Sequence, residues 1–332
     1  MTKTRFGVIG TGGIAGDFCE ALGSSVSCEV VSVAGSSPEK GAAFAKRFGL
    51  RPASTLHELL EASDVDVVYV ATPHPRHEAQ ALACIAQGKH VLCEKPLTVD
   101  APSTERVLDA ARRRGVFLME GYMYRCHPLL RALLERLPEI GELRHVRADF
   151  GFRVPRDPKG RLFDLALGGG GILDVGGYTT SFSRLLAGVA VGKPFAEPTS
   201  LSAVGYRGPT GADELTTALL GFDSGFTATL TCAVHHRVGT EAAIYGEHGR
   251  IVLPDPWIPQ GDRQSRQTSF TLLREGAAAE VVTVTTERAT YALQAELVSE
   301  SLPACEAPWP AMTWADTLGN MRALDRWRDC LR

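Results

Sequence analysis

Residues 5–15 of the chain read RFGVIGTGGIA, and this stretch decides how the first part of the chain folds. An apolar run ending at Gly10 is followed by Gly12 and Ala15, which is the Gly-x-Gly-x-x-Ala form of the dinucleotide-binding turn. The first glycine permits a tight bend, the second lets the backbone approach a pyrophosphate, and the alanine lets the helix pack closely on the strand. The amino end of that helix then faces the negative charge. We therefore expect the cofactor to contact Gly10, Thr11, Gly12, Gly13, Ile14 and Ala15.

Outward from this turn, the chain shows two different patterns of predicted secondary structure. Short β-branched runs (5–9, 30–34, 65–71, 90–93, 116–119) alternate with helical patterns (14–22, 38–47, 76–87, 102–114). Such alternation predicts a doubly wound parallel sheet. After residue 122, strand-like runs follow one another and are separated by turn signals such as DSG at 223–225, which predicts antiparallel pairing. We predict an α/β protein with a Rossmann domain over residues 1–121 and an α+β domain over residues 122–332 that contains a large open, mainly antiparallel sheet.

Bulk composition narrows the class of protein. A chain of 332 residues suits two domains. A net charge of −3 gives no general attraction to nucleic acid or an anionic membrane, and no apolar run approaches the ~20 residues that a membrane span needs. The polar amino terminus leads directly into a strand, so we expect no signal peptide. The eight cysteines are scattered without metal-ligand spacing, which favours reduced thiols, a cytoplasmic location and no metal.

The choice between NAD and NADP depends on the end of the second predicted strand. An NAD enzyme usually carries Asp or Glu there, to hold the ribose 2′-hydroxyl. Here residues 34–37 read AGSS, and no acid occurs before Glu39. Ser36, Ser37 and Lys40 can accommodate a 2′-phosphate that a carboxylate would repel, although arginine, the strongest phosphate ligand, is missing. We expect NADP as the cofactor, with NAD as the alternative.

Lys95 is the first candidate for chemistry. It follows the predicted strand 90–93 within Glu94-Lys95-Pro96, and ligands of parallel sheets bind beyond the carboxyl ends of the strands. Its ammonium could hydrogen-bond a substrate hydroxyl or lower the pKa of a neighbouring acid. A cis peptide before Pro96 would fix the direction of the lysine. The alternative is an ordinary surface lysine.

Five motifs resemble those of the glucose–fructose oxidoreductase/inositol dehydrogenase (Gfo/Idh/MocA) family, over essentially the whole chain. They are YVATPH at 69–74, GKHVLCEKP at 88–96, MEGYMYRCHP at 119–128, GGGILDVGGY at 169–178 and WADTLGNM at 314–321. The resemblance implies a Rossmann domain, an active site in the cleft between it and the second domain, and a homodimer or homotetramer that buries the open sheet face.

The resemblance also implies that Lys95 and Tyr178 are the catalytic pair. Many members carry Asp and His four residues apart on one helix, whereas this chain has Asp174 and Tyr178, as in the tyrosine branch that includes dihydrodiol and xylose dehydrogenases. That spacing places both side chains on one helix face. A tyrosine with a pKa of about 10 needs a nearby cation such as Lys95 to exchange a proton near neutrality. Asp174 either orients substrate or caps the helix, and the residues leave both roles open.

Further candidates lie outside the Lys95–Tyr178 pair. Arg125 either lines the substrate site or forms a structural ion pair, and His127 shares these alternatives. Arg161 is expected to contact substrate, His77 to begin a helix as a surface residue, and Trp257 to pack a loop rather than bind sugar. The other cofactor contacts that we expect, from strand ends and from the resemblance, are Ala71, Thr72, His74, Glu94, Lys95 and Glu120.

These observations predict an NAD(P)-dependent oxidoreductase that transfers a hydride between nicotinamide and a carbinol carbon of a sugar or cyclic diol, without a metal. The first alternative is an NADPH-dependent keto-sugar reductase in a biosynthetic pathway. The second is a non-catalytic NADP-sensing regulator, but a sensor has no need of both Lys95 and Tyr178. The residues specify neither the particular sugar or diol nor the physiological direction of the reaction.

Overall fold

The apolar run before Gly10 forms β1 (Thr4–Ile9), which lies inside a six-stranded sheet of order β3-β2-β1-β4-β5-β6. Every pair of neighbouring strands in this sheet is parallel, so the predicted doubly wound sheet is confirmed. The computed structural model describes residues 3–259 and 267–331. The remaining strands of this sheet are β2 (Cys28–Ala34), β3 (Arg51–Ala53), β4 (Val67–Val70), β5 (His90–Cys93) and β6 (Leu118–Glu120).

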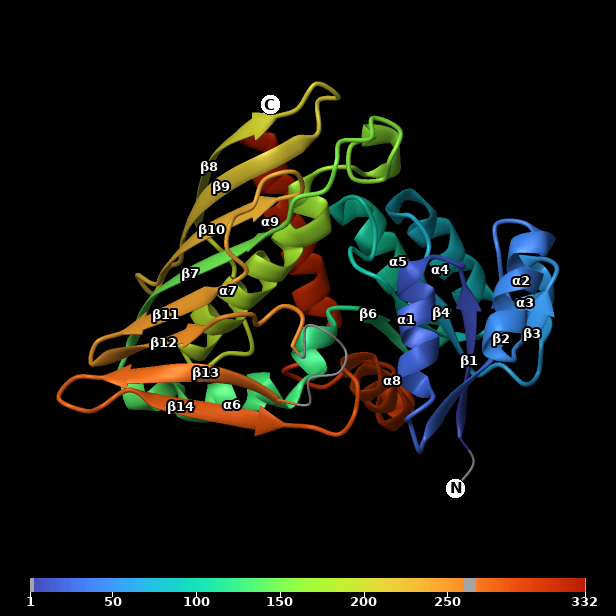
Figure 1. Ribbon diagram of the computed structural model, residues 1–332, viewed down its shortest axis with the longest axis horizontal. Helices are drawn as coiled ribbons and strands as arrows, with labels where there is room; N and C mark the ends of the chain where they lie inside the picture. The colour runs from blue at the N-terminus through green and yellow to red at the C-terminus, as the bar shows by residue number, and fades with distance from the viewer. Residues whose placement is uncertain (1–2, 260–266, 332) are drawn as a thin grey trace. The chain divides into compact units, whose positions relative to one another are not determined.

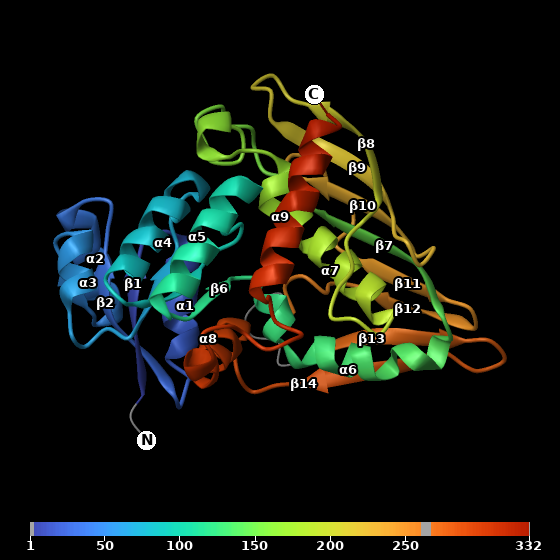
Figure 2. The same ribbon diagram turned by 180° about the vertical axis from the view of Figure 1, so that it is seen from behind.

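Helices cover both faces of this sheet. Helices α1 and α8 lie on one face, and α4 and α5 lie on the other (Figures 1 and 2). Helix α5 shows why these segments start and stop where they do, because the Asp100 carboxylate accepts the Ser103 N–H at 2.8 Å and Gly115 ends the helix at φ 68°. The helices are α1 (Gly13–Leu22), α2 (Pro38–Phe48), α3 (Leu56–Glu61), α4 (His77–Ala86), α5 (Ala101–Arg114) and α8 (Thr290–Ser301).

The chain forms two units whose division differs from the predicted one. The first unit comprises the described residues up to Cys126 together with Glu287–Thr317, and the second comprises His127–Thr286 and the rest of the described chain. The predicted boundary at 121/122 is close to the first crossing, but it assigned 287–317 to the wrong side. Ala295 and Val298 of α8 belong to the same apolar core as Phe18 of α1. A helical pattern states which face is apolar but not which sheet that face covers.

The second unit is built on an eight-stranded sheet of order β14-β13-β12-β11-β7-β10-β9-β8. All neighbouring strands are antiparallel except β7 and β10, which run parallel, so the predicted mainly antiparallel sheet is confirmed. The strands are β7 (Leu143–Gly151), β8 (Ser200–Arg207), β9 (Asp213–Gly221), β10 (Thr227–Ala233), β11 (Ala242–Gly246), β12 (Gly249–Leu253), β13 (Gln267–Arg274) and β14 (Glu280–Thr285).

One face of this second sheet carries helices. They are α6 (Pro128–Arg136), a π-helical turn (Ile172–Gly176) that continues into α7 (Gly177–Val189), and most of α9 (Trp314–Asp329), as Figure 2 shows. On the covered face, Trp327 of α9 donates its indole N–H to the Thr216 hydroxyl of β9 at 3.0 Å. Within the described part of the unit no helix lies on the other face, where the side chain of Leu219 is 57% exposed. The sheet is therefore open on one side.

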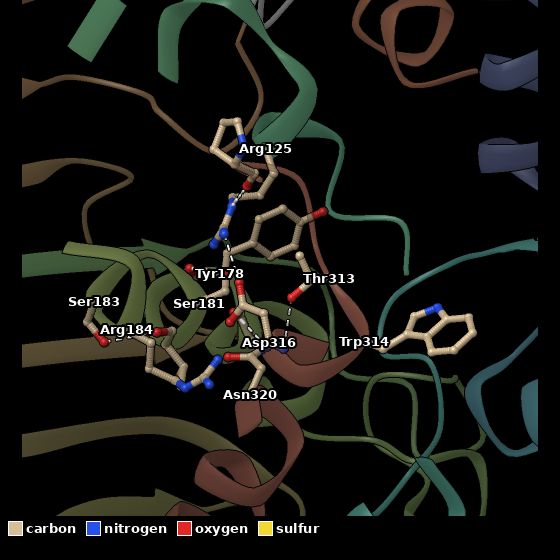
Figure 3. Close-up of polar contacts among 12 residues, drawn as sticks. Arg125, Tyr178, Ser181, Ser183, Arg184, Thr313, Trp314, Asp316 and Asn320 are labelled. Atoms are coloured by element: carbon tan, nitrogen blue, oxygen red, sulfur yellow. Dashed lines mark hydrogen bonds and ion pairs between the residues drawn. The ribbon is translucent and has the colours of Figure 1, made fainter. Parts of the chain in front are cut away.

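A buried ion pair joins two distant segments of the first unit. Arg125 donates to the Asp316 carboxylate at 2.8 Å and to the Pro310 carbonyl at 2.6 Å, and the two charged side chains are 0% and 1% exposed (Figure 3). The Thr313 hydroxyl accepts the Asp316 N–H at 3.2 Å, which caps the start of α9. Arg125 thus holds residues 310–316 against the segment that follows β6.

We expect Asp316→Asn to destabilise the protein by about 3–5 kcal/mol, because it leaves the Arg125 charge buried without its counter-charge. Urea denaturation measures the change. Asp109→Asn is the matched control, since it breaks an exposed pair with Arg112 (side chains 61% and 43% exposed) that is worth about 0–1 kcal/mol. Equal losses in the two variants would contradict this account of the buried pair.

Candidate active site

The dinucleotide turn has the conformation that the motif requires. Gly10 has φ 115°, and a Cβ added there would lie 2.4 Å from the Ala71 carbonyl oxygen. Its N–H donates to the Ala34 carbonyl at 2.9 Å, while the Ala71 N–H donates to the Ile9 carbonyl at 2.9 Å. Only glycine allows the ends of β1 and β4 to approach so closely.

The following residues fit the pyrophosphate of a dinucleotide. Gly12 and Gly13 are exposed, and a Cβ added at either would meet no described atom within 4 Å. Helix α1 begins at Gly13, and none of the described side chains caps it. Its first N–H groups are therefore available for an anion. Ala15 is buried against the strand, as the motif predicts, and Thr11 and Ile14 lie on the same turn.

The ribose side of the site shows one departure from expectation. The Ser37 hydroxyl caps α2 by accepting the Lys40 N–H at 3.4 Å, and it also hydrogen-bonds the Glu39 carboxylate, which lowers the pKa of Glu39. Ser37 is thus engaged in holding the helix start. Ser36 and Lys40 are exposed beside it. Ser36 and Lys40 therefore stay the predicted contacts of a 2′-phosphate.

Several buried side chains hold the turn that carries Lys95. The Tyr69 hydroxyl donates to Glu94 Oε1 at 2.5 Å, and the Lys95 N–H donates to Glu94 Oε2 at 3.3 Å. Glu120 Oε1 accepts the Leu97 N–H at 2.9 Å. The Lys95–Pro96 peptide is cis, as the sequence suggested. Glu94 and Glu120 thus shape the lysine turn through the backbone.

His77 corrects the sequence interpretation. It begins α4, as expected, but its side chain is 0% exposed rather than on the surface. Its Nδ1 lies 2.8 Å from the Pro96 carbonyl and its Nε2 lies 2.7 Å from the Thr72 carbonyl. Burial lowers the pKa of His77. The buried His74 ring lies 5.8 Å from it, so the loops after β4 and β5 meet around these two rings. Nothing local in the sequence signals these contacts, because both partners are backbone carbonyls.

In the second unit, Asp174 and Tyr178 lie on the helical segment that follows the glycine run. The Asp174 carboxylate is buried and accepts from Arg161 Nη1 at 2.8 Å, which brings two of the predicted substrate residues together. The Tyr178 ring is buried edge-on against Phe150, with ring centroids 5.2 Å apart. The segment Ile172–Gly176 is π-helical rather than α-helical, and π turns are common at functional sites.

Trp257 packs, as predicted, but against the helix of Tyr178. Its indole N–H donates to the Asp149 carbonyl at 2.8 Å, and its side chain is fully buried. Ring centroids lie 6.5 Å from Tyr178 and 5.5 Å from Phe182. This aromatic cluster orients the tyrosine ring. No local pattern in the sequence predicts this cluster, since its members are far apart along the chain.

These contacts bear on three residues whose roles the sequence leaves open. Asp174 does not cap the helix, because the Ile172 N–H donates to Asp213 Oδ2 at 2.7 Å. Arg125 is engaged in the buried pair with Asp316, which favours its structural alternative over a substrate contact. His127 also has a structural role, since its Nδ1 accepts the Leu129 N–H at 3.0 Å and caps α6. Burial lowers the pKa of His127 to about 4.

Each unit therefore contains some of the predicted site residues. The first unit contains the dinucleotide turn, the loops after β4 and β5, and Lys95; the second contains Asp174, Tyr178 and Arg161. The described residues include no group of three His, Cys, Asp or Glu side chains that could hold a metal ion. Among the described helices, none has both the length and the hydropathy of a membrane span. The fold and the dinucleotide turn define a dinucleotide-binding protein of the Rossmann class.

Comparison with known proteins identifies the family. The family model described as "Oxidoreductase family, NAD-binding Rossmann fold" of the Gfo/Idh/MocA group matches residues 4–122, and the Gfo/Idh/MocA C-terminal domain model matches residues 130–252. The chain belongs to the Gfo/Idh/MocA family. It is accordingly an oxidoreductase with NAD(P) as its cofactor.

Relatives extend this likeness along most of the chain. The mouse (Mus musculus) trans-1,2-dihydrobenzene-1,2-diol dehydrogenase is 36% identical over 260 residues, which cover 77% of this chain and 76% of the relative. The human (Homo sapiens) enzyme of the same name is 34% identical over 261 residues, with 77% and 76% coverage. A 3-ketoreductase from Actinomadura kijaniata, solved with NADP and TDP-benzene, has a TM-score of 0.86 and 29% identity, and the match covers 100% of this chain and 98% of that one.

Gly10→Ala is expected to weaken cofactor binding about 100-fold or more, because the added methyl group collides with the Ala71 carbonyl and displaces the turn. Titration of intrinsic fluorescence with NADPH measures the affinity. Gly49→Ala is the control: Gly49 also has a positive φ, of 68°, but no described atom lies near its added Cβ. That variant is expected to lose about 1–2 kcal/mol of stability and to keep its affinity. Unchanged NADPH affinity in Gly10→Ala would argue against this turn as the pyrophosphate site.

Proposed function

We propose that this protein is an NADP-dependent dehydrogenase of the CH–OH groups of cyclic diols or sugars, in which Lys95 and Tyr178 carry the proton transfer. The observation that carries the proposal is the dinucleotide half-site in one unit, with Lys95 held at a strand end, together with Tyr178 in an aromatic cluster of the other unit. The similarity to the trans-1,2-dihydrobenzene-1,2-diol dehydrogenases supports a diol as substrate. When bound, the nicotinamide supplies or accepts the hydride.

The roles of the residues follow from their chemistry. The Tyr178 hydroxyl accepts the proton of the substrate hydroxyl during oxidation and returns one during reduction. The Lys95 ammonium supplies the positive charge that favours the phenolate form of the tyrosine. The Asp174 carboxylate, paired with Arg161, orients a substrate hydroxyl. Gly10, Gly12, Gly13, Thr72 and Ser36 are the proposed cofactor contacts, together with the backbone at the start of α1.

A second candidate is the reductive direction on a keto-sugar. The observation that favours it is the match along the whole chain to the Actinomadura kijaniata 3-ketoreductase, which was solved with NADP. The same residues serve both directions, because the proton that Tyr178 accepts in oxidation is the one it donates in reduction. An assay with NADPH and keto-sugars decides between the two.

We also propose a cytoplasmic homodimer or homotetramer. The eight cysteines, all within the described residues, form no disulfide, which suits a reducing compartment. Leu219 and Val204 expose apolar side chains on neighbouring strands of the open sheet, and such a surface suits burial against a second copy. Light scattering after size-exclusion chromatography measures the oligomeric state.

Tyr178→Phe is expected to lower kcat about 100- to 10,000-fold with trans-dihydrobenzenediol or an aldose, because it removes the group that exchanges the proton. NADP+ reduction followed by absorbance gives kcat, and fluorescence titration gives the cofactor affinity, which is expected to stay unchanged. Tyr206→Phe, at an exposed tyrosine of β8, is the control with full activity. Full activity of Tyr178→Phe would refute the assigned role, and tight NADP+ binding by the wild type without turnover in either direction would favour a sensor.

Ser36→Asp is expected to lower kcat/KM for NADP+ about 10- to 100-fold and to raise it for NAD+. A carboxylate at this strand end repels the 2′-phosphate and accepts a hydrogen bond from the 2′-hydroxyl. Steady-state kinetics with both cofactors measure the ratio. Ser63→Asp places the same charge at an exposed position before β4, at the opposite end of the sheet, and is expected to leave the ratio unchanged. A wild type that prefers NAD+ would overturn the assignment of NADP.

A further inference from the structure

The glycine run before the Tyr178 helix leaves room for a carboxylate from another part of the unit. Gly170 has φ 130°, and a Cβ added there would lie 2.1 Å from Asp213 Oδ1. A non-glycine residue would therefore be strained and would displace the Asp213 side chain. The Ile172 N–H donates to the other carboxylate oxygen of Asp213 at 2.7 Å, and the Gly171 N–H also faces this carboxylate. Gly170 and Asp213 thus form one contact at the start of the helical segment.

The position of Asp213 is fixed by the sheet rather than by the helix. It is the first residue of β9, whose Leu215 pairs with Ala233 of β10. The first N–H groups of a helix have no partner within the helix, and a negative charge beside them is favourable. The carboxylate therefore attaches the start of the helical segment to the end of a sheet strand.

Backbone hydrogen bonds connect the Gly170–Asp213 contact to Asp174 and to the turn that carries Tyr178. The Asp174 N–H donates to the Gly170 carbonyl at 3.3 Å, so the backbone that Asp213 holds also sets the position of Asp174. The next turn carries Tyr178, and there Asn320 donates its side-chain N–H to the Gly177 carbonyl at 3.3 Å. Movement at residues 170–172 would thus shift Asp174 and rotate the turn that carries the tyrosine.

We propose that Asp213 is a positioning residue: its carboxylate, seated in the space left by Gly170, fixes the start of the helix and so aligns Asp174 and Tyr178 for proton transfer. This inference rests on the proposed function, in which Tyr178 exchanges a proton with substrate. Asp213 itself touches neither substrate nor cofactor in this scheme. Nothing in the motif around Tyr178 points to it, because 41 residues separate Asp213 from Ile172.

The charge of Asp213 matters for this role. Burial raises the pKa of Asp213 to about 6, while the N–H groups of Ile172 and Gly171 and the charge of Arg328 on α9 oppose the rise. The Cys232 thiol of β10 lies close enough to interact with the charge of Asp213. Arg207 of β8 is paired with Asp213 of β9 in the strand register. The protonated acid is a poorer acceptor for two N–H groups. We therefore expect kcat to fall as the pH drops through about 6, in step with loss of the charge.

The experiment compares Asp213→Asn with wild type. The amide keeps the shape of the side chain but removes the charge, and we expect kcat to fall about 10- to 100-fold, as for a misplacement of about 1 Å. The wild-type decline of kcat near pH 6 is expected to be absent from the variant. NADPH affinity is expected to stay unchanged. Hydrogen–deuterium exchange of the peptide over residues 170–178, measured without substrate, is expected to accelerate.

Stability provides the contrast with a merely structural role. A carboxyl group whose pKa rises on folding stabilises the folded state most below its unfolded pKa, and this contribution is lost as the pH rises through about 6. Removing the charge therefore offsets the lost cap at pH 8, and we expect the melting temperature of Asp213→Asn to stay within a few degrees of wild type. Glu58→Gln is the matched control, because its carboxylate accepts the Ser54 N–H at 2.7 Å at the start of α3. It is expected to keep wild-type kcat and wild-type exchange at 170–178.

The outcomes are separable. The proposal would be overturned if Asp213→Asn kept wild-type kcat and wild-type hydrogen exchange. It would also be overturned if the loss of kcat came with weaker NADPH binding and a melting temperature lowered by more than a few degrees. A wild type without turnover would refute the proposed function, while hydrogen exchange at 170–178 would still decide the role of Asp213. If Asp213→Asn does not fold, Gly170→Ala displaces the same carboxylate from the other side and is assessed by the same measurements.

Discussion

The parallel pairing of β1, β4 and β5 is the constraint on which the nucleotide half of the site depends. Parallel strands place their carboxyl ends along one edge, so Gly10, the Thr72 loop and the Lys95 turn share that edge although more than 80 residues of chain separate the first from the last. The close approach of Gly10 to the Ala71 carbonyl shows how tightly the edge is packed. His77 and Glu120 then fix the backbone of the lysine turn from neighbouring elements.

In the second unit, contacts from the sheet hold the ring and the helix of Tyr178 in place. A tyrosine that exchanges a proton, as we propose for Tyr178, needs a fixed ring and a fixed backbone. Phe150 and Trp257 hold the ring, and the glycine run with Asp213 holds the helix start. Asp213 belongs to a strand of the sheet, so the start of the helix is anchored to a rigid element. Without this carboxylate, the first two N–H groups of the helical segment would lack an acceptor. Burial between the sheet and the helix start raises the pKa of the Asp213 carboxyl group.

Sequence reasoning succeeded where one residue type has one physical use. The glycines of the dinucleotide turn, the alternation of strands and helices, and the switch to antiparallel strands were all predicted and are all present. It failed where the hydrogen-bond partner of a side chain is far away in the sequence or is a backbone group. His77 resembled a surface helix residue because its two acceptors are carbonyl groups, and Asp213 was not noticed at all. The alternative roles of Arg125 stayed open until Asp316 was found beside it.

The sequence by itself determined the class of the fold, the dinucleotide turn and the family motifs, because these depend on local periodicity and on glycines at fixed spacing. Only the tertiary structure showed that residues 287–317 complete the first unit, that Arg125 pairs with Asp316, and that Asp213 accepts the N–H at the start of the Tyr178 helix. These depend on contacts between segments far apart in the chain. The energy of such a contact arises from burial and from the pairing of charges and N–H groups, which no local pattern records.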